Sequence, residues 1–508
     1  MGISRRAFLT GSVSGAVLLL AACTTDSPSP SASPTPSPSP TTTPSPTPVG
    51  DGPVPAAFRR SAWADDPYAL GAGSHLAPGS DEGDRSALRE PIGDRLFLAG
   101  EATASTSPGT VSGARASGFE VADAVAAVAE PGERIAVVGA GMAGATAARS
   151  LADRGFDVVV VEARDRVGGR VRSYDSDDWP FPIELGAGVP LGDAAVAMRA
   201  ALALAGTPLV ALARSVETRT PDGGVSPDTG AAAAALVSAA SWATRQEADL
   251  SVAEALVGSG ADQVDASPDG TGVSDAQRLA LLVDQVLPAR FGAPADDLSA
   301  RELAAATSTG ALDDLLLPTD AALVTGGLSA FVTAQLAGLD VLRDSNVVRI
   351  QHGDRGVGLR TATGESLSAD RAVVTIPLAV LKAGTTEFSP ELPSSHRDAV
   401  DALGVGHQEV LWLRFAEPFW STEATVWTIV DETARWRVFV NLLPATGEPV
   451  LVAVAGGDDA VAGLELDDDD AVAEAMASLA PYLDLVGTPD DAATPPADGA
   501  AVSPTPAS

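Results

Sequence analysis

The chain has 508 residues, a formal net charge of −35 and a single lysine, Lys382. Its length is enough for a large core and two domains, while the lack of a basic face argues against nucleic acid as a partner. With Cys23 as the one cysteine, disulfides and thiolate metal clusters within the chain are excluded, and the four histidines show no metal-ligand spacing. The acidity indicates a well-solvated surface or, alternatively, steering of cationic substrates.

The first 23 residues are expected to be an export signal. The run Ser4-Arg5-Arg6-Ala7-Phe8-Leu9 resembles a twin-arginine motif. The apolar run from Gly15 to Ala22 is too short to span a bilayer. It ends in Leu20-Ala21-Ala22-Cys23, which resembles a lipoprotein processing box. We therefore expect export by the twin-arginine route and a lipid anchor at Cys23, on the outer face of the bacterial cytoplasmic membrane.

Two segments are expected to lack a folded core. Residues 24–52 consist almost entirely of Ser, Pro and Thr, and residues 487–508 repeat that composition. Such tracts cannot bury enough apolar surface to fold. The first is predicted to be an extended linker and the second a disordered tail.

A strand, a turn and a long helix are predicted before residue 130. The stretch Arg95 to Thr103 indicates a short apolar strand followed by a glycine turn. Thr110 to Ala129 is alanine-rich and predicts a helix. The sequence Glu130-Pro131-Gly132-Glu133 then marks a turn into the next strand.

A complete βαβ unit follows. Ile135 to Val138 is a β-branched run typical of a buried parallel strand. Ala145 to Arg154 predicts a helix that ends at Gly155. Asp157 to Val161 predicts a second buried strand. This pattern indicates a doubly wound sheet with a ligand at the carboxyl ends of its strands.

Glycines and one acid lie where this unit would meet a dinucleotide. Gly139 allows a tight turn, Gly141 lets the backbone approach a pyrophosphate, and Gly144 lets the helix pack close to the strand. The helix N-terminus offers free N–H groups to the phosphates. Glu162 is placed to accept hydrogen bonds from ribose hydroxyls, which argues against the 2′-phosphate of NADP.

The residues that follow resemble those of the flavin-containing amine oxidase family. The run from Glu162 through Arg164, Gly168 and Gly169 to Arg170 resembles the second flavin motif of that family, and the segment around Val347 resembles a later one. The resemblance covers roughly residues 57 to 485 and implies FAD as the cofactor. It implies these cofactor-binding residues: Gly139, Gly141, Gly144, Glu162, Arg164, Gly168, Gly169, Arg170, Val347, Glu101, Thr110 and Val111.

The same resemblance implies an unusual order of segments. Trp63 to Gly71, the strand and turn around Glu101, and the helix beginning at Thr110 resemble the end of family members, yet they precede the βαβ unit. No second copy follows Leu464. We therefore expect a circular permutation, with the old ends joined at residues 130–133.

An α/β fold is expected, with a Rossmann-like FAD-binding domain and a discontinuous α+β substrate domain. Residues 53–130 are predicted to be the displaced end of the FAD domain, 131–190 its opening unit, 191–320 and 381–486 the substrate domain, and 321–380 the remainder of the FAD domain.

Three positions depart from the family pattern. Val410 stands where many members carry a lysine beside the flavin, and Gly73 replaces a tyrosine of the aromatic cage. Thr110 stands at the other cage position. His407, three residues before Val410, is expected to be a surface residue. Catalytic residues are therefore left unassigned, with Thr110 and His75 as weak candidates.

The leading hypothesis is an FAD-dependent oxidoreductase that oxidises an amine or amino acid with O2, giving imine or aldehyde and hydrogen peroxide. One alternative is an oxidase or desaturase of an apolar, non-amine substrate. Another is a catalytically weak FAD-binding surface protein. A small-molecule substrate and O2 are the expected partners, and the sequence leaves substrate identity and oligomeric state open.

Overall fold

The computed structural model describes residues 53–189, 192–226, 230–307, 315, 317, 318 and 321–483. The predicted signal with Cys23, the linker 24–52 and the tail 487–508 lie outside these residues. Within the described part of the chain, no helix is long and apolar enough to cross a bilayer. The same residues hold no cluster of three or more metal-ligating side chains.

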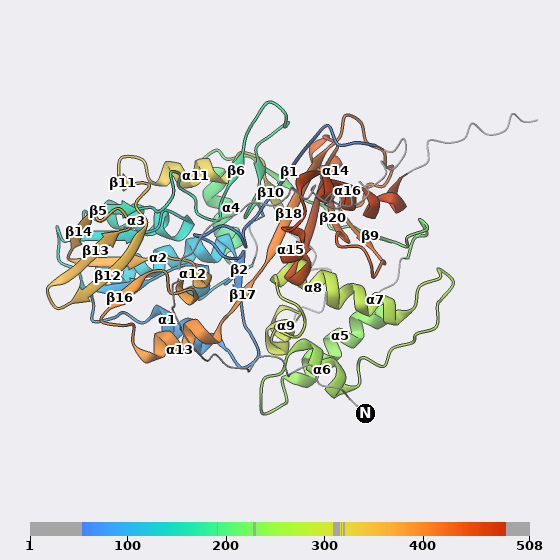
Figure 1. Ribbon diagram of the computed structural model, residues 1–508, viewed down its shortest axis with the longest axis horizontal. Coiled ribbons are helices and arrows are strands. Elements are labelled where there is room, and N and C mark those ends of the chain that lie inside the picture. The colour runs from blue at the N-terminus through green and yellow to red at the C-terminus, as the bar shows by residue number, and fades with distance from the viewer. Residues whose placement is uncertain are drawn as a thin grey trace, which may run out of the picture. The chain divides into compact units, whose positions relative to one another are not determined.

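A five-stranded parallel sheet forms the centre of the cofactor half (Figure 1). Its strand order is β11 (Asp340–Leu342), β5 (Asp157–Val161), β4 (Arg134–Val138), β15 (Arg371–Val374) and β3 (Leu96–Leu98). The predicted strands β4 and β5 are confirmed, and both are buried beyond their first residue. Valine-rich strands suit this position because helices or a second sheet cover both faces of a parallel sheet.

One face of this sheet carries α2 (Val111–Val128) and α3 (Met142–Asp153). The two helices pack closely because Gly118 has no side chain, and a Cβ there would lie 2.6 Å from the Ala143 carbonyl oxygen. The helix predicted over residues 145–154 begins three residues earlier, since Gly141 already serves as its N-cap. Also on this side lie α4 (Ala195–Leu204) and α11 (Leu328–Gln335).

The other face packs against a four-stranded sheet and two helices. The strands run in the order β14 (Ser366–Ala369), β13 (Gly356–Thr361), β12 (Val347–Gly353) and β16 (Glu387–Ser389). The helices are α1 (Glu82–Arg89) and α13 (Ser394–Ala402), with the short α12 (Leu378–Lys382) beside them. The parallel sheet is therefore a middle layer between these two groups of elements.

A six-stranded sheet forms the second half. Its order is β1 (Ala57–Arg60), β18 (Gln408–Arg414), β21 (Val450–Gly456), β20 (Val438–Asn441), β19 (Val426–Ile429) and β9 (Val216–Arg219). Residues 57–60, expected in the FAD domain, thus form the edge strand of this other sheet through antiparallel pairing with β18. Beside the sheet lie α14 (Leu443–Thr446), α15 (Gly457–Gly463), α16 (Asp468–Ser478) and a 3₁₀ turn at Ala480–Tyr482.

Helices from the middle of the chain complete the second half. They are α5 (Gly230–Ala243), α6 (Val252–Ser259), α7 (Asp275–Leu281), a π-helical turn at Leu282–Val286, α8 (Leu287–Phe291) and α9 (Ala300–Ala306). Three two-stranded ladders complete the structure: β2 (Gly73–His75) with β17 (Gly404–Gly406), β8 (Leu209–Ala211) with β10 (Ala322–Val324), and β6 (Ser173–Tyr174) with β7 (Ile183–Glu184). The predicted α/β fold with a discontinuous second domain is confirmed.

Candidate active site

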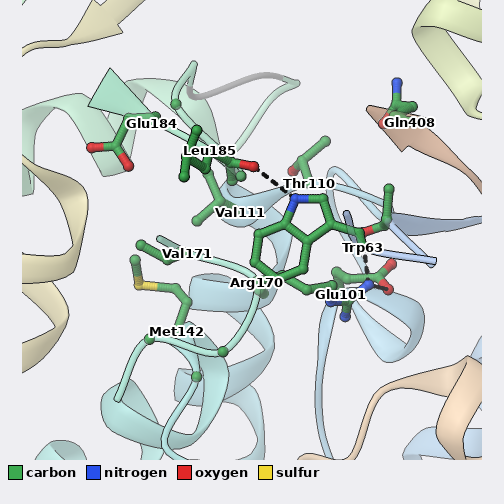
Figure 2. Close-up of a pocket in the computed structure, with 18 of the residues that line it drawn as sticks. Trp63, Glu101, Thr110, Val111, Met142, Arg170, Val171, Glu184, Leu185 and Gln408 are labelled. Atoms are coloured by element: carbon green, nitrogen blue, oxygen red, sulfur yellow. Dashed lines mark hydrogen bonds and ion pairs between the residues drawn. The ribbon is translucent and has the colours of Figure 1, made fainter. Parts of the chain in front are cut away.

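A cavity of about 450 Å³ extends from the glycine motifs at the ends of β4 and β5 to the six-stranded sheet. Every residue predicted to bind the cofactor lines it except Gly144, which lies behind the wall. Figure 2 shows Met142 on one side of the view and Gln408 on the other, with the Trp63 indole between them. The tertiary structure has therefore brought distant sequence segments to the walls of one cavity.

The cofactor end is a cradle made of backbone. Gly141 and Gly168 form a parallel β-bridge, so the two glycine motifs lie side by side. Gly139 and Gly168 have φ angles of 104° and 107°, which only glycine adopts without strain. A Cβ added at Gly144 would lie 2.0 Å from the Gly139 carbonyl oxygen. The cradle therefore needs glycine for backbone conformation at two positions and for space at a third.

Glu162 holds the cradle from beneath. Its carboxylate is buried and accepts N–H hydrogen bonds from Ala140 over 2.7 Å and from Arg164 over 2.9 Å. These two bonds fix the carboxylate between the first glycine motif and the residues that follow β5. Glu162 also lines the cavity, so it retains the place predicted for contact with ribose hydroxyls.

Arg164 is tied to the displaced N-terminal segment. Its guanidinium donates to Asp66 over 2.5 Å and lies 5.2 Å from the centre of the Tyr68 ring. Arg164 and Tyr68 line the cavity, whereas Asp66 does not. This contact connects a residue before the βαβ unit with one directly after it.

Glu101 and Arg170 form the charged pair of the cradle. Arg170 donates to Glu101 and to the Ala72 carbonyl, each over 2.9 Å, and Ser74 Oγ donates to Glu101 over 2.6 Å (Figure 2 shows the pair). Burial acts to raise the pKa of Glu101, but Arg170, Ser74 and the buried Arg85 lower it overall. Arg170, predicted to bind the cofactor, is thus already partly neutralised by Glu101.

Thr110 is the N-cap of α2. Its hydroxyl accepts from the Gly113 N–H over 3.0 Å and donates to the Ser107 carbonyl over 2.7 Å. Both Thr110 and Val111 line the cavity. The free N–H groups of the α2 N-terminus therefore lie at the cavity, where they favour negative charge.

The structure separates the remaining candidates. His75 is buried and is not among the cavity-lining residues. Burial lowers its pKa to about 4, so it is neutral at physiological pH. His407, expected on the surface, is half-buried: its Nδ1 is shielded from solvent, and its backbone N–H donates to the Gly292 carbonyl. Val410 and Val347 both line the cavity.

The end beside the six-stranded sheet is aliphatic. Its walls come from β18 to β21 and from loops near β8 and β10; they are Leu212, Leu315, Leu317, Leu323, Val410, Trp412, Val426, Val438, Val440, Leu442, Val452 and Val454. We call this end the aliphatic chamber.

The polar residues that line the cavity and that sequence reasoning missed include Glu184, Arg290 and Gln408. Burial raises the pKa of Glu184 to about 7, while Leu328 N–H and Ser173 Oγ donate to its carboxylate. The only available signal for Glu184 was its place in a family-like segment, and neither Arg290 nor Gln408 stood in a motif.

Comparison with known proteins defines the class. The family model for flavin containing amine oxidoreductases matches residues 47–126 and 142–498. Polyamine oxidase 4 of Oryza sativa subsp. japonica is 31% identical over 68% of this chain and 72% of its own length. Polyamine oxidase 2 of Arabidopsis thaliana is 30% identical over 64% of this chain and 67% of its own length. The chain belongs to the flavin containing amine oxidoreductase family.

Solved structures agree on the fold. Putrescine oxidase, in a structure with bound putrescine, superposes with a TM-score of 0.54 at 21% identity and covers 69% of this chain and 81% of its own. The backbone cradle, the α2 and α3 N-termini and the acid Glu162 fit FAD, since glycine backbone, helix N-termini and a carboxylate meet at one end of the cavity. The protein is thus an FAD-dependent oxidoreductase of the amine oxidase type.

Proposed function

We propose that this chain oxidises an amine in the aliphatic chamber and passes the electrons to O2, giving an imine and hydrogen peroxide. The single observation that carries the proposal is the continuity of the cavity from the glycine cradle to that chamber. When bound, FAD accepts the two electrons that leave the substrate carbon.

The residues of the chain supply binding and orientation. The hydrocarbon walls exclude water, and a low-dielectric surrounding favours the neutral form of an amine, whose lone pair is then available. Gln408 donates its amide N–H to the Ala289 carbonyl over 2.5 Å, which fixes its position in the wall. The N-terminus of α2, capped by Thr110, directs N–H groups toward the cavity and stabilises developing negative charge there.

The experiment is a spectrum followed by a substrate panel. The purified protein should show the visible absorption of bound flavin and should release peroxide with at least one amine or amino acid. Absence of flavin would contradict every form of the proposal, because each requires bound FAD. Reduction by an apolar alcohol or polyene, but by no amine, would favour the non-amine oxidase, and no reduction by any donor would favour a binding protein.

Circular permutation is part of the proposal. It is supported by a family match in two pieces that leaves out residues 127–141, the region of the expected join. It is also supported by contacts between β1 and the last described elements: Arg60 donates to the Leu466 carbonyl over 2.6 Å and pairs with Asp468 over 2.7 Å. Ends that lie near each other are the condition for tolerated permutation.

A rearranged gene tests the permutation. Residues 53–130 are moved behind residue 483 through a flexible linker, and flavin content and melting temperature are compared with those of the original. We expect both to be retained. A control chain cut at residue 148, inside α3, should lose flavin because the cut divides the cradle. Loss of flavin in the first rearrangement but not in the control would refute the permutation.

Export and anchoring also remain proposals. They are supported by the Arg5-Arg6 pair and by Cys23 after an apolar run. Replacement of both arginines by lysine should leave the protein in the cytoplasm, and Cys23→Ser should release it from the membrane fraction without the mass of an attached lipid. A wild-type protein without lipid would contradict the anchor.

A further inference from the structure

The charges of the aliphatic chamber differ from those a polyamine would require. A chain with several ammonium groups needs carboxylates along its path. Among the described residues that line the cavity outside the cradle, the charged side chains are Glu184 and Arg290. Glu184 already accepts hydrogen bonds from Ser173 and Leu328. The remaining charge, on Arg290, is positive and repels a polycation.

Arg290 is a cation without a full partner. It lies on α8, which packs against β18 and β21, the strands that carry the chamber walls. No hydrogen bond or ion pair links its guanidinium to any residue that the structure describes. Its guanidinium lies over the Phe291 ring, with 5.3 Å from Cζ to the ring centre. Arg290 is half-buried, and this burial lowers its pKa.

Glu302 is the counter-charge that acts on Arg290, and it offsets the positive charge only in part. Its carboxylate accepts the Leu76 N–H over 2.6 Å. Burial raises the pKa of Glu302 to about 7, so the carboxyl is only partly ionised at neutral pH. A half-buried guanidinium with a weakened counter-charge has donors available for an anion.

We propose, building on amine oxidation as the proposed function, that the substrate is an aliphatic amino acid whose carboxylate pairs with Arg290 while its side chain occupies the aliphatic chamber. A guanidinium suits this task because it presents a planar fork to a carboxylate. The amino acid R–CH(NH2)–COO⁻ loses two hydrogens to become an imino acid. Water then hydrolyses the imino acid to a 2-oxo acid and ammonia, and O2 takes up the two electrons and two protons as hydrogen peroxide.

Binding of a carboxylate that cannot be oxidised tests the assignment directly. 4-Methylpentanoate has the hydrocarbon body and carboxylate of leucine but no amine. Its dissociation constant is measured by titration of the flavin spectrum of the holoenzyme and by calorimetry. Arg290→Met should weaken this binding about 10- to 100-fold, the usual value of a charged hydrogen bond in a buried site. Arg290→Lys should restore part of it.

The matched control is Arg349→Met, because Arg349 is exposed and pairs with Glu387 away from the cavity. This variant should bind 4-methylpentanoate as the wild type does. Flavin content and melting temperature of all variants show whether they are folded. If Arg290→Met does not fold, the comparison of wild type with Arg290→Lys still decides, since a lysine lacks the fork and should bind several-fold more weakly.

Turnover separates this inference from the proposed function. Peroxide is measured with leucine, with 3-methylbutylamine, which is leucine without its carboxylate, and with spermidine. We expect leucine to be preferred by wild type and the preference to fall in Arg290→Met. Oxidation of either amine in preference to leucine, or equal binding of 4-methylpentanoate by wild type and Arg290→Met, would overturn the assignment of Arg290 and leave amine oxidation standing. Absence of peroxide with any amine or amino acid would refute the proposed function, while the binding measurement still decides the role of Arg290.

Discussion

A single added methyl group at Gly144 should disable the cofactor cradle. In Gly144→Ala, the new Cβ would lie 2.0 Å from the Gly139 carbonyl oxygen and 3.0 Å from Thr375 Oγ1. Non-bonded heavy atoms pack at about 3.5–4.0 Å, so the closer contact has to open by about 1.5 Å. The contacted oxygen belongs to the backbone, which cannot rotate away as a flexible side chain could. The N-terminus of α3 must therefore move outward from β4.

The cost follows from that displacement. Overpacking of this kind typically costs about 1–3 kcal/mol of folding free energy. A shift of about 1.5 Å also exceeds what a hydrogen bond from the α3 N-terminus to a phosphate tolerates, and each such bond to a charged group contributes about 1.5–3 kcal/mol. We therefore expect the FAD dissociation constant to rise about 10- to 100-fold.

The assay is reconstitution of the apoprotein with FAD, followed by flavin fluorescence, with urea unfolding measured in parallel. The control is Gly270→Ala, because a Cβ there meets no atom within 4 Å and the residue has an ordinary φ angle. Gly270→Ala should match the wild type in both measurements. Wild-type FAD affinity in Gly144→Ala would refute the argument that this glycine is required for space.

Two further variants test the surroundings of the cradle. Arg371 donates to Glu133 and to the Val128 carbonyl, both over 2.6 Å, and so holds the turn between α2 and β4. Arg371→Met should therefore lower the unfolding free energy by about 2–3 kcal/mol, whereas Arg349→Met, at an exposed side chain, should lower it by about 1 kcal/mol or less. Equal losses of the two variants in urea unfolding would contradict this role. The pKa of Glu184 lies at about 7 instead of 4.5, so between these values the folded chain retains a proton that the unfolded chain has released. The unfolding free energy should therefore fall by up to about 1.4 kcal/mol per pH unit as the pH rises through that window. Glu184→Gln should lack this contribution, and a constant difference between variant and wild type from about pH 5 to about pH 7 would speak against it.

The parts of the fold that could be predicted depend on neighbours in sequence. The strand 157–161 was predicted to the residue and α2 to within one residue at each end, because valine runs, caps and helix propensity are properties of short segments. The glycine motif predicted the cradle for the same reason. Its three glycines and Glu162 are separated by fewer than about 25 residues, so one βαβ unit brings them together.

The missed parts depend on contacts between distant segments. Residues 57–60 joined the six-stranded sheet because β18 offered an edge, and nothing within the segment indicates which edge it meets. His407 was expected on the surface and is instead half-buried, with its backbone bonded to the distant Gly292. Arg290 lies in a region that offered no motif, and its importance comes from the hydrocarbon walls that other elements place around it.

The sequence alone determined the class of cofactor site, since spacing of glycines along one βαβ unit specifies how a backbone approaches a pyrophosphate. It also determined the parallel strands and the helix that begins at Thr110. Only the tertiary structure decided which charges face the substrate. Arg170 meets Glu101 across 69 positions of sequence, and the chamber lined by Arg290 takes walls from β18 to β21, more than 100 residues further along the chain. The physical reason is that burial and pairing, which set the electrostatics of a site, are properties of the packed whole and are absent from any local pattern.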